Sequence, residues 1–408
     1  MDDPIAVLRS HLARFDAPLR VETSFTALQP WARTWFCVAG GELWTTPKAR
    51  CKVGSSSAAR RGCGTCLPNR HRKGNLLQLL LDFIRVRGPL RPNLHACATF
   101  SCQDAPRFAE DGPQRFVLSY SSSSCLPAPS HITCPPRSER TWDVPFVDYH
   151  MPLRWPKWLD TLRDAKSAPP TWQRKHDIGL VAFGHDIPYQ AKAHKQAGFF
   201  DANATLRALV LRHAFYHSCG RQATYDWSGR LRIVGGPEST AKFIPRSEFC
   251  RHRYVVLLAG QSSWLDSIKH VLGCGSLIIY IADTGSRSML PLSRHARDPV
   301  MHSLVNGSHW LHYDVDGDAV HSRKLCDLVA GAVQWARQNP VRARAIAERG
   351  AQLVRRHWSV EGVYDFVNAT LEGLAALQGA EVVNTTIYAL HGSPIKSPSD
   401  AMDNPEVD

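Results

Sequence analysis

Long apolar runs are missing from this chain of 408 residues. No stretch of about 18 or more apolar residues occurs, so we predict no transmembrane helix. The N-terminal stretch MDDPIAVLRSHLARFDAPLR begins with acidic residues and has no continuous apolar core, so it is not typical of a signal peptide. Helix-turn-helix, zinc-finger and RNA-binding signatures are also absent from the sequence. These absences argue against a membrane-spanning protein and against a dedicated nucleic-acid-binding protein.

Acidic side chains are fewer than basic ones. The 36 Asp and Glu residues stand against 49 Lys and Arg residues, which gives a formal net charge of +13 at pH 7. Such a charge favours an anionic partner or substrate, for which nucleic acid, an acidic membrane surface and small molecules bearing phosphate all qualify. The basic residues are spread along the chain and do not form a basic tail, which disfavours a nucleic-acid-binding arm.

A complete zinc motif is missing as well. Cys63 and Cys66 form one Cys-x-x-Cys pair, but no second pair and no His-x-x-x-His follows at the required distance, so we expect no metal site. The 12 cysteines instead favour disulfides, and four Asn-x-Ser/Thr sequons indicate a secretory compartment. The sequons begin at Asn203, Asn306, Asn368 and Asn384. We therefore expect the lumen of the endoplasmic reticulum or Golgi, and a targeting segment that is missing from this chain.

The stretch Tyr254–Ile281 contains the clearest local pattern. An aliphatic run over 254–259 predicts a buried strand, Gly260–Ser263 a turn, residues 264–273 a helix and residues 276–281 a second strand. A strand, helix and strand in this order form a βαβ unit with parallel strands. The start of a helix beside a glycine turn is suited to phosphate, although many such units bind no ligand.

The remaining pattern predicts an α/β protein of two domains with a disordered tail, and the assigned bounds are 1–170, 171–378 and 379–408. The sequence of residues 1–75 predicts no clear secondary structure. In residues 142–158 aromatic residues alternate with proline, which indicates a packed surface loop or the wall of a sugar pocket. We expect helices over 76–86, 203–217, 322–338, 340–357 and 360–378, and strands over 94–102, 116–120, 177–184 and 310–315.

The sequence resembles the CAP10-like, or protein O-glucosyltransferase, family (glycosyltransferase family 90). The resemblance covers about residues 245–375. It rests on the order of these matching residues: Tyr254, Gly260, Lys269, Cys274-Gly275-Ser276, His312-Tyr313 and Ala347-Glu348-Arg349-Gly350. Upstream, LHACATFSCQDAPR resembles the family's strand that ends in Asp-x-Pro, and Arg207 falls at the position of a donor-binding arginine.

The resemblance implies a GT-B fold, in which two Rossmann-like domains face each other across a cleft. It also implies an inverting, metal-independent transfer of glucose or xylose from a UDP-sugar to a hydroxyl of a protein or glycan. No cofactor is implied besides the UDP-sugar, which is the donor substrate. Asp104 matches the general base. The expected donor-binding residues are Arg207, Gly260, Gln261, Ser262, Ser263, Trp264, Ser267 and Lys269.

Two positions depart from the family pattern. Ser267 stands where the family carries an arginine, and Gly184-His185 replaces the arginine of a Phe-Arg-Gly strand end. These departures leave three interpretations open: an active enzyme with other cations in the cleft, a glycosyltransferase with a changed donor, and a catalytically impaired relative that binds nucleotide or sugar. An exostosin-like transferase and a basic nucleic-acid binder are two further classes that stay open. Lys269 also has two interpretations, as a donor contact or as a structural lysine.

Overall fold

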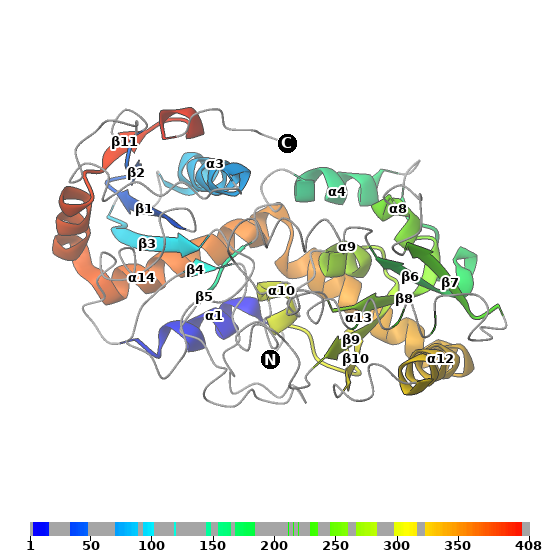
Figure 1. Cartoon of the computed structure of the whole chain (residues 1–408). Coiled ribbons are helices and arrows are strands. Elements are labelled where there is room, and N and C mark those ends of the chain that lie inside the picture. The colour runs from blue at the N-terminus through cyan, green and yellow to red at the C-terminus, as the bar shows by residue number, and fades with distance from the viewer. Residues whose placement is uncertain are drawn as a thin grey trace.

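The computed structural model describes residues 3–15, 33–47, 70–88, 93–101, 118–119, 144–147, 154–164, 168–183, 211, 215, 219, 229–235, 245–259, 267–283, 298–315 and 323–401. Within these ranges the strands form two sheets, one in each half of the molecule (Figure 1). Helices surround both sheets, so the α/β class is confirmed. No helix in the described ranges is both long enough and apolar enough to cross a membrane.

The second sheet is entirely parallel, with the strand order β10-β9-β8-β6-β7. Its central strands are continuous apolar runs because helices cover them, as is usual for parallel sheets. The strands are β6 (His176–Phe183), β7 (Leu231–Gly235), β8 (His252–Leu258), β9 (Leu277–Asp283) and β10 (Leu311–Val315). The associated helices are α8 (Arg246–Phe249), α9 (Ser267–Gly273), α10 (Pro299–His302), α12 (Arg323–Gln338) and α13 (Pro340–His357).

The predicted βαβ unit is present as β8, α9 and β9. β8 and β9 are parallel neighbours, with Tyr254 opposite Leu277 and Leu258 opposite Ile281. The helix ends at Gly273, as predicted, and Gly275 follows with φ +65°, a left-handed conformation that glycine adopts without strain. Local turn chemistry therefore fixes the end of this helix.

The first sheet is mixed, with the strand order β11-β2-β1-β3-β4-β5. Only β3, β4 and β5 are parallel, whereas β11, β2, β1 and β3 pair antiparallel. Gly40 and Gly41, both with positive φ, connect β1 to β2 in a tight hairpin. This hairpin lies within residues 1–75, for which the sequence predicted no clear secondary structure. The bounds are β1 (Arg33–Ala39), β2 (Glu42–Thr45), β3 (Ala96–Ser101), β4 (Leu118–Ser119), β5 (Val144–Pro145) and β11 (Ser393–Ile395).

The C-terminal segment differs from the expected disordered tail. Helix α14 (Val360–Ala389) passes through Gly379, where φ is +70°, and so consists of two helical segments. After it β11 pairs with β2, and the 3-10 helix η9 (Pro398–Asp400) follows. Composition suggested disorder beyond residue 378, but burial of apolar side chains such as Val383 and Ile395 orders the segment through residue 401.

Helix α14 also joins the two halves. It packs against α13 at one end and extends below β3 and β1 (Figure 1). Gln378 accepts a hydrogen bond from Cys97 N at 2.7 Å and donates one to Cys97 O at 2.8 Å. Its side chain thus satisfies both backbone groups of a strand residue. Two further helices, α1 (Pro4–Leu12) and α3 (Arg70–Arg87), pack in this half.

The segment 142–158 is not a surface loop in its described part. Residues 144–145 form β5, and α4 (Arg154–Arg163) follows. Phe146 and Trp155 are fully buried, and the Trp155 indole donates a hydrogen bond to Trp358 O. Aromatic burial has overridden the weak local pattern, so these two rings offer no open face to a sugar.

Every cysteine in the described ranges is in a disulfide, as the cysteine content favoured. The three bonds join Cys37 to Cys97, Cys219 to Cys326 and Cys250 to Cys274. The first links directly opposite residues of β1 and β3. The expected loop at Cys63 and Cys66 lies outside the described residues.

Candidate functional site

The carboxyl ends of the parallel sheet form one edge of the second half. Asp283 at the end of β9 lies opposite Val315 of β10, and Phe183 of β6 lies opposite Gly235 of β7. Ala259 N, just past β8, donates a hydrogen bond to Ile281 O at 2.9 Å. Open α/β sheets bind their ligands outside this edge, in the crevice where adjacent connections diverge. This edge is therefore the candidate site.

Most of the predicted site residues lie outside the described ranges. The donor-binding candidates Gly260, Gln261, Ser262, Ser263 and Trp264 belong to the connection that leaves β8 at this edge, and Arg207 and Asp104 are also not described. The strand that leads to Asp104 is β3, which ends at Ser101. Its arrowhead in Figure 1 points towards the half that contains the parallel sheet.

Two of the predicted donor residues are described, and both lie on α9. Ser267 is its first described residue and is half-buried, while Lys269 is only 1% exposed. The helix is buried over Ile268–Gly273 because α4, α8, α10, α13 and β9 all pack against it. An ammonium group in such an interior needs polar partners. The burial of Lys269 is compatible with a structural lysine and with a contact to a donor phosphate that is shielded from water.

A histidine–aspartate pair lies near the same edge. His312 and Asp314 are two residues apart on β10, so their side chains are on one face of the strand. His312 Nε2 lies 2.9 Å from Asp314 Oδ1, and the His312 side chain is 3% exposed against 31% for Asp314. Sequence reasoning singled out His312 with Tyr313 but missed Asp314. The period of two along a predicted strand was the available signal.

The Ala347-Glu348-Arg349-Gly350 motif serves packing in this structure. A Cβ on Gly350 would lie 2.8 Å from His309 O and 2.7 Å from the side chain of Leu272. Only glycine therefore lets α13 approach both α9 and the segment before β10 so closely. Arg349 Nε donates to Ser308 O at 2.9 Å, and this bond also ties α13 to the segment before β10.

The Cys274-Gly275-Ser276 motif lies at the opposite, amino edge of the parallel sheet. Lys175 Nζ donates to Cys274 O at 2.8 Å and to Ser276 Oγ at 2.7 Å, and Ser276 Oγ donates to His252 O. Burial lowers the pKa of Lys175 to about 7. A neutral amine has two N–H groups, which match these two acceptors.

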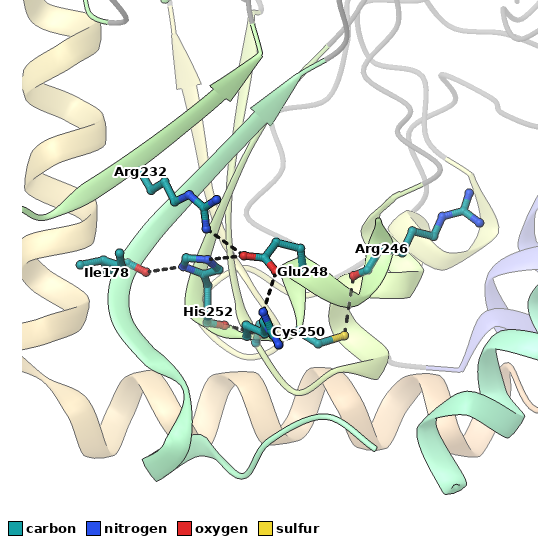
Figure 2. A network of polar contacts seen from close by, with 8 residues as sticks. Ile178, Arg232, Arg246, Glu248, Cys250 and His252 are labelled. Atoms are coloured by element: carbon teal, nitrogen blue, oxygen red, sulfur yellow. Dashed lines mark hydrogen bonds and ion pairs between the residues drawn. The ribbon is translucent and has the colours of Figure 1, made fainter. Parts of the chain in front are cut away.

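Further polar contacts cross this amino edge (Figure 2). Glu248 of α8 pairs with Arg232 of β7 at 2.8 Å, and His252 Nδ1 lies 3.3 Å from Ile178 O of β6. Burial is the main cause that lowers the pKa of His252. Tyr254 donates to Asp177 at 3.0 Å, and burial together with this carboxylate raises the tyrosine pKa to about 12. These contacts hold β6, β7 and β8 together, so the amino edge has a structural role.

The two edges thus differ in their chemistry. The amino edge is crosslinked by the Cys250–Cys274 disulfide and by paired polar groups. The carboxyl edge leads into the connections that carry the sequence candidates for phosphate binding. Among the described residues, no group of three or more His, Cys, Asp or Glu side chains could hold a metal ion.

Comparison with known proteins assigns the family. The family model of glycosyl transferase family 90 matches residues 137–389, which is more than half of the chain. The matched region contains the whole parallel sheet, α9, α13 and α14. A search among curated proteins found no match. The family match agrees with the motifs around β8, α9, β10 and α13, and the chain belongs to glycosyl transferase family 90, a family of glycosyltransferases.

Proposed function

We propose that this glycosyltransferase moves glucose or xylose from a UDP-sugar to a hydroxyl group of a protein or glycan, with inversion and without a metal ion. The observation that carries the proposal is the family match across the entire parallel sheet. We further propose a GT-B arrangement, in which residues 1–170 supply the acceptor side and 171–378 the donor side. The helix α14 and β11 then return to the acceptor-side sheet.

The donor would lie at the carboxyl edge of the parallel sheet. Gly260, Gln261, Ser262, Ser263 and Trp264 follow β8 there, and backbone N–H groups at the start of a helix stabilise a diphosphate. The diphosphate gains negative charge as its bond to the sugar breaks, so cations such as Arg207 and Lys269 would stabilise the leaving group. Ser267 supplies a hydroxyl in place of the family's arginine. We assign the missing positive charge to other basic groups of the cleft.

Asp104 would be the general base. Its carboxylate takes the proton from the acceptor hydroxyl while that oxygen attacks C1 of the sugar from the face opposite UDP. The new C1–O bond forms as the bond from C1 to the diphosphate oxygen breaks, and the electron pair leaves with UDP. The position of Asp104 three residues past the end of β3 supports this role. The His312–Asp314 pair near the donor edge would position donor hydroxyls.

A secretory compartment fits the same proposal. Three disulfides are present in the described ranges, and disulfides persist in oxidising compartments such as the lumen of the endoplasmic reticulum. The net charge of +13 suits an anionic nucleotide donor.

A thermal-shift titration tests the donor site. UDP, UDP-glucose and UDP-xylose should each raise the melting temperature, because a ligand that binds only the folded state stabilises it. Gly260→Trp and Arg207→Ala should abolish the shift, whereas Arg230→Ala should keep it. Arg230 is the matched control because it pairs with Gln334 at the amino end of β7, away from the proposed site. A UDP shift that survives both site variants would place the donor elsewhere.

Turnover separates the enzyme from a catalytically impaired relative. Asp104→Asn should lower the rate of sugar transfer by about 10²–10⁴-fold while UDP still binds. Asp365→Asn is the control, since this carboxylate lies on the surface beside Arg87. Transfer at the wild-type rate in Asp104→Asn would refute the assignment of the base. A wild-type protein that binds UDP but transfers no sugar from any donor would instead support the impaired relative.

A further inference from the structure

Three of the four glycosylation sequons lie in the described ranges, and their structural environments differ. Asn306 precedes β10, while Asn368 and Asn384 lie on the first and second segments of α14. An N-linked glycan is bulky and hydrophilic, so a folded protein accommodates it only on an exposed side chain. The structure can therefore distinguish among motifs that are equivalent in sequence.

The second segment of α14 has one buried and one exposed face. Val383, Thr386 and Leu390 are buried, and Val383 and Leu390 pack in a cluster with Trp35 and the Cys37–Cys97 disulfide. Asn384 and Thr385 are exposed, and so is Tyr388, at 85%. Residues four apart on a helix lie on the same face, so Tyr388 is one turn from Asn384. Asn384 therefore points away from the core, beside an aromatic ring on which a sugar can pack.

The other two described sequons are less suitable. Asn306 Nδ2 donates to His312 O at 3.1 Å and its Oδ1 accepts from His312 N at 2.9 Å, so the amide holds the backbone of β10 at both atoms. A sugar attached to Asn306 Nδ2 would occupy the space that this contact needs. Asn368 is half-buried on the first segment of α14, the neighbour of Phe366 and Val367 in the core.

We propose that Asn384 carries an N-linked glycan, and that Asn306 in the folded protein does not. The modification joins the amide nitrogen of Asn384 to C1 of an oligosaccharide supplied as a lipid diphosphate. The bond from C1 to the diphosphate oxygen breaks, the lipid diphosphate leaves and the amide nitrogen loses one proton. Glycans are attached before folding is complete, so a chain modified at Asn384 still folds, whereas one modified at Asn306 cannot form its contact with β10.

The site lies far from the proposed chemistry. The second segment of α14 is at the outer end of the first sheet, and the parallel sheet occupies the other half of the molecule (Figure 1). The inference shares with the proposed function only the secretory compartment. A glycan at Asn384 therefore predicts no change in UDP binding.

The test is site-resolved mass spectrometry of the full chain produced through a eukaryotic secretory pathway. Enzymatic release of N-linked glycans should convert Asn384 to Asp in the peptide that contains it, and leave the peptide with Asn306 unchanged. Asn384→Gln should remove the mass of one glycan from the intact protein. Thr385→Ala is the matched control, because it alters the exposed neighbour but keeps Asn384 and Thr386 of the sequon.

Each result decides the proposal. An unmodified Asn384 in the folded wild-type protein, with or without glycans at other sites, overturns it, and so does a glycan on Asn306. The UDP thermal shift is measured on wild type and Asn384→Gln in parallel. Absence of the UDP shift in both proteins, with a glycan present at Asn384 of the wild type, would refute the proposed function and leave this inference intact.

Discussion

Lys175 is a buried amine whose charge state is set by its environment. It is 4% exposed, and burial lowers its pKa to about 7. Its partners, Cys274 O and Ser276 Oγ, are both uncharged, so neither supplies a negative charge that would stabilise the ammonium form. At neutral pH this residue thus links the end of α9 to β9 largely through ordinary hydrogen bonds.

Replacing Lys175 with Met should change the pH dependence of stability. Between pH 7 and about 10, the unfolded chain holds a proton that the folded Lys175 has lost, so the free energy of unfolding of the wild type rises with pH. The slope of wild type should exceed that of Lys175→Met by up to about 1.4 kcal/mol per pH unit in this window. Denaturant unfolding at pH 7, 8 and 9 measures it. Lys157→Met, at an exposed lysine, should retain the wild-type slope, and equal slopes in all three proteins would contradict the prediction.

At the scale of elements, α14 depends on a polar contact with β3. Cys37 and Cys97 are directly opposite, with a Cα separation of 4.0 Å, which is typical of a pair whose backbone groups point away from each other. The free backbone groups of Cys97 are the ones that Gln378 satisfies. The Gln378 side chain therefore bonds these groups as the backbone of a neighbouring strand would.

Gln378→Leu should destabilise the protein strongly. It leaves a buried N–H and a buried C=O without their partner, at a cost of about 1–3 kcal/mol for each group. Gln352→Leu, at an exposed position of α13, should change the free energy of unfolding by less than about 0.5 kcal/mol. Urea denaturation of the three proteins gives the comparison. A Gln378→Leu protein as stable as the control would show that the contact contributes nothing.

At the scale of the whole molecule, a histidine pair lies where α1 of the first half meets α10 of the second. The rings of His11 and His302 are 5.3 Å apart in an edge-on arrangement, and Arg14 Nη2 lies 3.2 Å from His11 Nδ1. Burial, His302 and Arg14 together hold the pKa of His11 well below its usual range. The contact between α1 and α10 is therefore most stable when His11 is neutral.

Acid should weaken the protein through His11. Below about pH 6.5 the unfolded chain binds a proton that folded His11 resists, so the free energy of unfolding falls as the pH falls. His11→Phe keeps an aromatic ring and should lose less stability between pH 7 and 5 than wild type does. Melting temperatures over this range test the difference. The control is His391→Asn, because asparagine tolerates the positive φ of 54° at this position, and its melting temperatures should follow those of the wild type. The effect would be excluded if the melting temperatures of His11→Phe and wild type fell in parallel.

The sequence by itself determined the family, the α/β class and the β8–α9–β9 unit, because aliphatic runs, glycine turns and motif spacing are local properties. The same local reasoning could have found the Gly40-Gly41 hairpin and the pairing of His312 with Asp314. It could not reveal that residues 379–401 return to the first sheet, since composition alone suggested disorder there.

Tertiary structure decided the roles of the motif residues. Cys274-Gly275-Ser276 and Gly350 match the family, yet their contacts hold elements together instead of facing the candidate edge. The bond between Lys175 and Cys274 joins residues 99 positions apart, and the Gln378 contact joins residues 281 positions apart. Burial and pKa depend on such distant neighbours, which no local pattern encodes. For the same reason, only the folded chain separates Asn384 from Asn306, although both belong to intact sequons.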